Sequence, residues 1–175
     1  MTGFPSMALE WFREARSTLE PANVVPKAFT GKATMIQWVL PGHTNALGTV
    51  FGGIIVSWVD IVGLTACQRY ARAPVVTLSI DHLQFIAPIK VGYTVILNAE
   101  VIYVGKTSME AEVLVEAENT VTGSTTRAAK AYVTYVALDA SGKPLPVPPL
   151  ELHTEDQRLR FNEAEERRSQ RRRWR

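Results

Sequence analysis

A long apolar stretch directly after a pair of glycines constrains this chain more than any other feature. Residues 54–67 are hydrophobic around most of the circumference of a helix, a pattern typical of a helix buried on all sides. The one charged residue in the stretch is Asp60. Burying an unpaired carboxylate is costly or forces its pKa upward, so Asp60 is a candidate functional residue. The alternative is a structural aspartate that accepts a core hydrogen bond or lies at a helix edge.

The segment before this helix is polar and rich in glycine. It contains Asn45, Gly48, Gly52 and Gly53 and leads into the helix N-terminus, where unpaired backbone N–H groups and the helix dipole favour negative charge. Glycine also lets a ligand approach the backbone closely. We therefore expect an oxyanion-stabilising site at Gly52 and Gly53. A tight turn without a ligand is the alternative.

Helix geometry separates the two candidate sites. Asp60 lies seven residues beyond Gly53, which places it two turns and about 10 Å further along the helix. One small carbonyl group cannot contact both the Gly53 N–H and the Asp60 side chain of the same helix. If both serve one reaction, the aspartate comes from a second copy of the chain. The sequence therefore predicts a homodimer with composite active sites.

Strand patterns surround the predicted helix. Five segments have the composition or alternation of strands: 33–40, 75–85, 93–103, 109–118 and 125–138. A turn at Gly105 and Lys106 joins the third and fourth segments into an antiparallel hairpin with one apolar and one wet face. A helix that is apolar nearly all round is buried most economically when such a sheet wraps around it. These patterns predict an α+β fold with a curved antiparallel sheet.

The two ends of the chain differ from its middle. Residues 1–28 place apolar side chains at helical spacing among charged ones, which predicts a helical extension and a proline-containing linker rather than a signal peptide. Residues 29–150 form the predicted main domain. Residues 151–175 have the pattern of a polar helix, with Thr154 as its cap and an arginine-rich end. We expect this basic end to be solvated, with contacts to ligand phosphates as the next alternative.

Composition restricts the class of protein. The 175 residues are 46% hydrophobic and 21% charged, which is typical of a globular domain. The single cysteine, Cys67, cannot form an intrachain disulfide and suits a reducing compartment, so a cytoplasmic location is expected. Residues 50–67 are nearly long enough to cross a membrane, but Asp60 and three glycines make insertion costly, so no span is expected. No metal is expected, because metal-ligand spacing is lacking among His43, His82 and His153.

Several short motifs occur together along the chain. They are Asn45-x-x-Gly48-x-x-Phe51-Gly52-Gly53, then Asp60, His82-Leu83-Gln84-Phe85-Ile86-Ala87-Pro88-Ile89, Val91-Gly92 and Val104-Gly105-Lys106-Thr107-Ser108-Met109. In this order and spacing, the motifs resemble the hotdog-fold acyl-CoA thioesterases of the cytosolic acyl-CoA hydrolase type, over about residues 33–146. The resemblance implies a hotdog fold, in which a five-stranded antiparallel sheet curls round a long central helix. It also implies dimers, which often assemble further into hexamers as trimers of dimers.

The resemblance implies roles for individual residues as well. In that family, the aspartate matching Asp60 is the general base or the nucleophile, and an asparagine matching Asn45 takes part. The backbone at the glycines matching Gly52 and Gly53 polarises the thioester carbonyl from the other subunit. The sequence does not choose between the two roles of Asp60. Further positions expected to border the acyl-CoA substrate, with plain loop or hairpin roles as the alternative, are His43, Phe51, Thr107 and Ser108. Candidates for contacts to the nucleotide phosphates of coenzyme A are Lys106, Arg69, Arg72 and the tail arginines, with solvated side chains as the alternative.

The function implied is hydrolysis of acyl-CoA thioesters to a carboxylic acid and coenzyme A. Because coenzyme A is part of the substrate, no separate cofactor is expected. A non-catalytic acyl-CoA-binding hotdog protein is a second interpretation. A hotdog enoyl-CoA hydratase or dehydratase is a third, but that chemistry wants an Asp/His pair and no histidine accompanies Asp60 on its helix. Nucleic acid is not expected as a partner, because the N-terminal helix has no second helix at helix-turn-helix spacing. Spacing does not reveal the acyl chain length.

Overall fold

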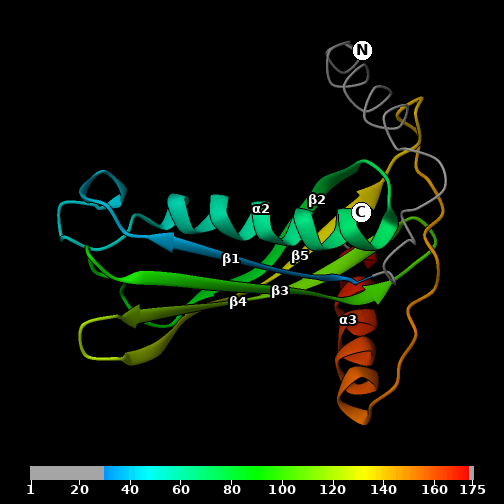
Figure 1. Ribbon diagram of the computed structural model, residues 1–175. Helices are drawn as coiled ribbons and strands as arrows, with labels where there is room; N and C mark the ends of the chain where they lie inside the picture. Colours follow the sequence, from blue (N-terminus) through cyan, green and yellow to red (C-terminus); the bar gives the residue numbers. More distant parts are fainter. Residues whose placement is uncertain (1–29, 174–175) are drawn as a thin grey trace, which may run out of the picture.

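The protein forms one curved antiparallel sheet with a helix on each face (Figure 1). This computed structural model describes residues 30–173, so the predicted N-terminal extension, 1–28, lies outside the described residues. The five strands lie in the order β1-β3-β4-β5-β2. Their bounds are β1 (Lys32–Trp38), β2 (Val75–Phe85), β3 (Thr94–Val104), β4 (Ser108–Asn119) and β5 (Ser124–Ala137). The predicted α+β architecture is confirmed.

The long helix α2 (Gly52–Ala71) lies along the concave face of the sheet, as its apolar sequence predicts. Alternate residues of β3 and β4 point toward it and have no or almost no exposed surface, including Val95, Leu97, Ala111, Val113 and Val115. The helix ends at Arg72, which takes the left-handed conformation (φ 52°) and donates its backbone N–H to the Gln68 carbonyl at 2.9 Å. The predicted packing of the apolar helix against the apolar face of the β3–β4 hairpin is thus confirmed.

One stripe of α2 is not covered within the single chain. Gly53, Ser57 and Ile61 are exposed, and Asp60 and Leu64 beside them are half-buried. These residues recur at three- and four-residue intervals, so they share one face of the helix. The prediction that this helix is buried on all sides is therefore wrong for the isolated protomer, because its own sheet wraps only part of the circumference.

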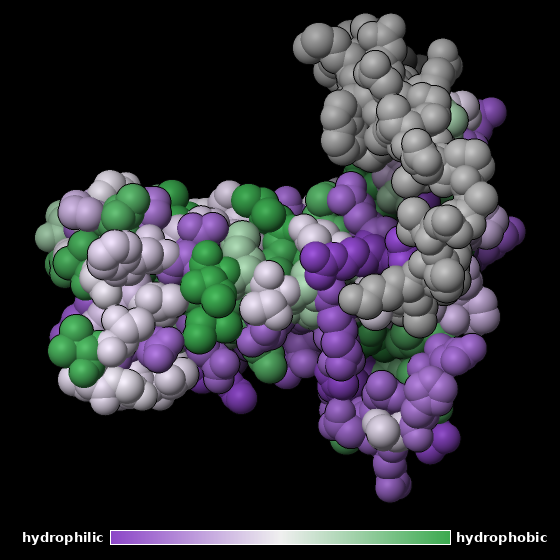
Figure 2. Space-filling model, viewed as in Figure 1, coloured by the Kyte–Doolittle hydropathy of each residue, from purple (hydrophilic) through white to green (hydrophobic). Residues whose placement is uncertain are grey.

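The C-terminal helix α3 (Glu155–Arg173) lies on the convex face, at one end of the sheet (Figure 1). Thr154 caps it as predicted: its Oγ1 accepts the Gln157 backbone N–H at 3.2 Å, and the Gln157 side chain accepts the Thr154 N–H at 3.1 Å. This reciprocal pair is a capping box. The rings of Phe161 and Tyr103 pack with their centroids 4.7 Å apart, and Ala164 is fully buried. The opposite side of α3 is hydrophilic (Figure 2).

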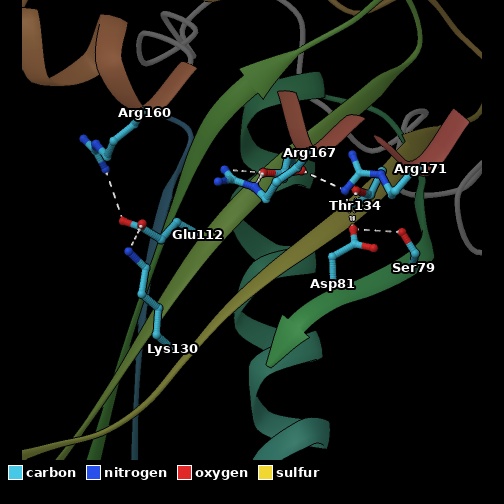
Figure 3. Close-up of polar contacts among 9 residues, drawn as sticks. Ser79, Asp81, Glu112, Lys130, Thr134, Arg160, Arg167 and Arg171 are labelled. Carbon is cyan, nitrogen blue, oxygen red and sulfur yellow. Dashed lines mark hydrogen bonds and ion pairs between the residues drawn. The ribbon is translucent and has the colours of Figure 1, made fainter. Parts of the chain in front are cut away.

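Three arginines of α3, Arg160, Arg167 and Arg171, are not solvated, contrary to the expectation of a solvated basic end. They pair with carboxylates on the convex face of the sheet (Figure 3). The ion pairs join Arg160 to Glu100 (2.9 Å) and Glu112 (3.4 Å), Arg167 to Glu110 (2.7 Å), and Arg171 to Glu110 (2.9 Å) and to Asp81. Glu110 is only 1% exposed, so the predicted wet face of the hairpin is dry beneath α3. A glutamate is buried this deeply only when it is paired.

Candidate active site

Asp60 lies in the middle of α2 and is held by two hydroxyl groups. Thr77 of β2 donates its Oγ1–H to Asp60 Oδ1 at 2.6 Å. Tyr135 of β5 donates its hydroxyl to the Asp60 backbone carbonyl at 3.0 Å and lies 3.5 Å from Oδ1. Thr77 and Tyr135 are direct partners in the β2–β5 ladder, so one row of the sheet supplies both contacts. The carboxylate is therefore fixed in orientation while remaining half-exposed at the uncovered stripe of α2.

Tyr135 reaches the helix because Gly63 has no side chain. A Cβ at Gly63 would lie 2.3 Å from the Tyr135 hydroxyl oxygen. Burial, and then the nearby Asp60 carboxylate, raise the pKa of the fully buried Tyr135 well above its ordinary value. Its hydroxyl therefore stays protonated and acts as a donor. Burial likewise raises the pKa of the Cys67 thiol, which leaves that residue inert as a nucleophile.

The N-terminus of α2 presents open backbone. Phe51 is the N-cap residue, in extended conformation and without a side-chain cap, and its own N–H is bonded to the His43 carbonyl at 2.9 Å. The N–H groups of Gly52 and Gly53 begin the helix, so they have no intrahelical acceptor. A Cβ at Gly53 would lie 2.6 Å from the Phe51 ring. The local geometry fits an anion-stabilising site, because the positive end of the α2 dipole and the unpaired N–H groups of Gly52 and Gly53 lie at the same helix end.

Asn45 and His43 both have structural contacts in the loop before α2. The Asn45 Oδ1 accepts the Leu47 N–H at 2.9 Å and both the N–H and hydroxyl of Thr49, at 3.3 and 3.2 Å. His43 Nδ1 accepts the Leu40 N–H at 3.2 Å. The His43 ring packs edge-on against the Trp58 ring, with the ring centroids 5.3 Å apart. The carboxamide nitrogen of Asn45 has no hydrogen-bond partner among the described residues.

The turn between β3 and β4 contains Lys106 and Thr107, and Ser108 is the first residue of β4. This turn lies at the opposite end of the sheet from the N-terminus of α2 (Figure 1). The Thr107 carbonyl accepts the Ala137 N–H at 3.0 Å, and the Lys106 carbonyl accepts a backbone N–H at 3.0 Å. Within one chain the structure therefore groups the predicted residues in two places. Asp60 lies between them.

Sequence reasoning missed Thr77 and Tyr135 as site residues. Thr77 alternates with apolar residues like any strand threonine, and Tyr135 lies 75 residues after Asp60 along the chain. Only the strand register brings the two hydroxyls to the same carboxylate. The small residue at Gly63 was the one signal in the sequence, since a glycine inside a helix points to a close approach by another group.

Residues 47–124 match the model of the thioesterase superfamily. The chain is 38% identical over 140 residues to the uncharacterized acyl-CoA thioester hydrolase YkhA of Bacillus subtilis, covering 80% of this chain and 81% of that protein. This chain belongs to the acyl-CoA thioester hydrolase family. It is also 36% identical over 135 residues to the rat cytosolic acyl coenzyme A thioester hydrolase, but spans only 35% of that longer protein.

Solved thioester hydrolases share the hotdog fold seen here. An apo-hexameric acyl-CoA thioesterase superposes with a TM-score of 0.79 at 36% identity, covering 82% of this chain and 92% of the other. The Staphylococcus aureus acyl-CoA hydrolase, solved with butyryl coenzyme A and coenzyme A, has a TM-score of 0.76 at 32% identity, covering 82% and 87%. The expected fold, family and enzyme class are thus confirmed.

Variants of the Staphylococcus aureus enzyme are also among the solved structures. In them an asparagine, an aspartate or a threonine is replaced by alanine. These three positions are separated along that chain by the same intervals as Asn45, Asp60 and Thr77 in this one.

Neither a metal-binding group of side chains nor a membrane-spanning helix is present in the described part of the chain. Between residues 30 and 173, no three or more histidine, cysteine, aspartate or glutamate side chains are grouped so as to hold a metal ion. Neither of the two described long helices has the length and hydropathy needed to span a membrane.

Proposed function

We propose that this protein hydrolyses acyl-CoA thioesters to a carboxylic acid and coenzyme A. The observation that carries the proposal is the Asp60 carboxylate, which Thr77 and Tyr135 hold in one orientation at the uncovered stripe of α2. A fixed carboxylate beside an open surface is suited to act on a bound ester. Membership of the acyl-CoA thioester hydrolase family identifies that ester as an acyl-CoA.

The reaction has two routes that this site supports. Asp60 either takes a proton from a water that attacks the carbonyl carbon, or attacks that carbon itself to give a mixed anhydride that water then opens. In both routes the carbon–sulfur bond breaks. The thiolate of coenzyme A leaves and then takes up a proton. The N–H groups of Gly52 and Gly53 stabilise the developing oxyanion, a contribution of about 3 kcal/mol per donor in known cases.

The active site is composite, with Asp60 from one protomer and the helix N-terminus from another. The two lie about 10 Å apart along the same helix, beyond the reach of one carbonyl group. The uncovered stripe of α2 and the edge strand β2, with Leu78 and Phe85 half-exposed, supply an apolar surface for a second copy. Solved relatives are described as hexameric, which a trimer of such dimers satisfies.

The remaining residues have supporting roles in this proposal. The Asn45 carboxamide nitrogen orients the water or the carbonyl, and His43 and Phe51 border the thioester. Lys106, Thr107 and Ser108 line the path of the coenzyme A arm. No cofactor is required, because hydrolysis needs only water and a substrate that brings its own coenzyme A. The name of the rat relative and the unpaired Cys67 support a cytoplasmic location.

The test is release of free thiol from acyl-CoAs of increasing chain length. The wild-type protein is expected to release coenzyme A, and Asp60→Asn to lower kcat by at least 100-fold while remaining a folded oligomer. Glu163→Gln, which also removes one negative charge but from an exposed position on α3, is the matched control and keeps wild-type rates. Binding of acyl-CoA without release would leave a non-catalytic binding protein, and formation of a hydroxyacyl product from an enoyl-CoA would indicate a hydratase.

A further inference from the structure

Arg168 differs from the other inward-facing arginines of α3. Arg160, Arg167 and Arg171 each pair with carboxylates on the sheet. Arg168 instead donates from Nη1 to the Tyr103 hydroxyl at 2.8 Å, with its guanidinium 5.6 Å from the centre of that ring. Among the described residues, no carboxylate lies within ion-pair distance of Arg168. Its charge is therefore held in place without being neutralised.

The guanidinium of Arg168 lies against the turn between β3 and β4. A Cβ built on Gly105 would lie 3.3 Å from Arg168 Nη2 and 3.4 Å from its Cζ. The next residue in the turn is Lys106, which likewise has no carboxylate within ion-pair distance in the described part of the chain. Two uncompensated positive charges thus occupy one end of the sheet, one on the turn and one on α3.

This end of the sheet is at the level of the active-site carboxylate. Met109, the second residue of β4, pairs with Tyr135, whose hydroxyl contacts Asp60. Tyr135 in turn pairs with Thr77. The turn, residues 105–107, therefore ends two residues before the row that holds Asp60. Strand β4 lies two strand spacings, about 10 Å, from β2. Asp60 lies on the concave side of the sheet, whereas Arg168 lies with α3 on the convex side, at the β3–β4 turn. A substrate whose reacting carbon is at Asp60 therefore has to extend past this row and around the turn to reach Lys106 and Arg168.

We propose that Arg168 and Lys106 form a phosphate site for the nucleotide end of coenzyme A, which makes the C-terminal helix part of the substrate-binding surface. The proposal rests on the proposed acyl-CoA hydrolysis. A guanidinium has five N–H donors in a planar fork that matches phosphate oxygens, and Tyr103 takes only one of them. Tyr103 keeps the fork rigid, so little conformational entropy is lost when phosphate binds. Lys106 adds a second, more mobile charge.

The competing explanation is that Arg168 only fastens α3 to β3 through Tyr103. The two explanations differ in which substrate is affected. A phosphate site matters for acyl-CoA but not for the corresponding S-acyl-pantetheine, which has the same thioester and no phosphate. A fastening role affects both substrates equally and lowers the melting temperature.

The experiment measures steady-state hydrolysis of both substrates by Arg168→Gln, Arg168→Lys and wild type. Arg158→Gln is the matched control, because Arg158 is also on α3 and is exposed. We expect Arg168→Gln to raise KM for acyl-CoA about tenfold with kcat little changed, and to leave the kinetics with S-acyl-pantetheine unaltered. Arg168→Lys keeps the charge and is expected to be intermediate. 3′-Dephospho-CoA thioesters identify which phosphate is bound.

An unchanged KM for acyl-CoA in Arg168→Gln overturns the proposal, and so does an equal loss with both substrates. If the wild-type protein hydrolyses neither substrate, the proposed function fails, but the phosphate site remains testable by calorimetric binding of coenzyme A. Weaker binding to Arg168→Gln than to Arg158→Gln then supports the site, and equal binding refutes it.

Discussion

The close approach of Tyr135 to Gly63 leads to a prediction that can be worked out in energy. A Cβ at position 63 would lie 2.3 Å from the Tyr135 oxygen, far inside van der Waals contact. Overpacking of this kind costs about 1–3 kcal/mol, and displacing the hydroxyl from the Asp60 carbonyl loses a hydrogen bond of about 1 kcal/mol. Against this, alanine gains about 1 kcal/mol over glycine in a helix interior. Gly63→Ala is therefore expected to destabilise the fold by about 2 kcal/mol.

The same substitution should be far milder where the hydroxyl is absent. In a Tyr135→Phe background the nearest atom to the new Cβ is a ring carbon at 3.1 Å, which needs only a small shift. The double-mutant cycle is therefore expected to show a favourable coupling of about 2 kcal/mol between the two substitutions. Denaturant unfolding of the four proteins at one protomer concentration measures it, since oligomerisation makes stability concentration-dependent. A Gly63→Ala protein that is as stable as wild type, or equally destabilised in both backgrounds, would refute the contact.

Three further predictions concern α3. Arg167→Met leaves the buried Glu110 with only part of its compensation and is expected to destabilise the protein by about 2–4 kcal/mol in denaturant unfolding. Burial raises the pKa of Glu100, but the hydrogen bonds and charges of Lys32 and Arg160 outweigh it and hold the pKa below its ordinary value. The contribution of ionised Glu100 to stability is therefore present above its unfolded-state pKa and is lost as the pH falls through its lower folded-state pKa. Between about pH 7 and about pH 3, the melting temperature of Glu100→Gln should therefore fall less than that of the wild type. Thr154→Ala removes the helix cap and should cost about 1 kcal/mol, measured by thermal unfolding.

The periodicity of the sequence predicted the parts of the fold in which burial repeats along the chain. The apolar run after Gly53 predicted α2, and the alternation of β3 and β4 predicted the inward face of the sheet. The same reasoning failed on the convex face, because it treats every charged strand position as wet. One signal for the buried pairing was present: Arg167 and Arg171 are four residues apart, so they share a face of α3 and can both reach Glu110.

The site residues also fall into two groups, those that the sequence revealed and those that it did not. Asp60 and the glycines were identifiable because a charge in an apolar helix and a glycine pair at its start both depart from the local pattern. Thr77 and Tyr135 were not identifiable, since neither departs from an ordinary strand and their meeting depends on the register of β2 with β5. Register is set by contacts between residues far apart in sequence, which no local spacing records.

Subunit complementation tests most directly whether the carboxylate and the oxyanion site come from different copies of the chain. Asp60→Asn and Gly53→Val are purified separately, shown to be folded oligomers with little hydrolysis, and then mixed under conditions that allow subunit exchange. A mixed dimer has one site with both substitutions and one with neither, so we expect acyl-CoA hydrolysis to recover to a substantial fraction of the wild-type rate. If each site were built from a single protomer, every site would retain one substitution, and mixing would restore no activity.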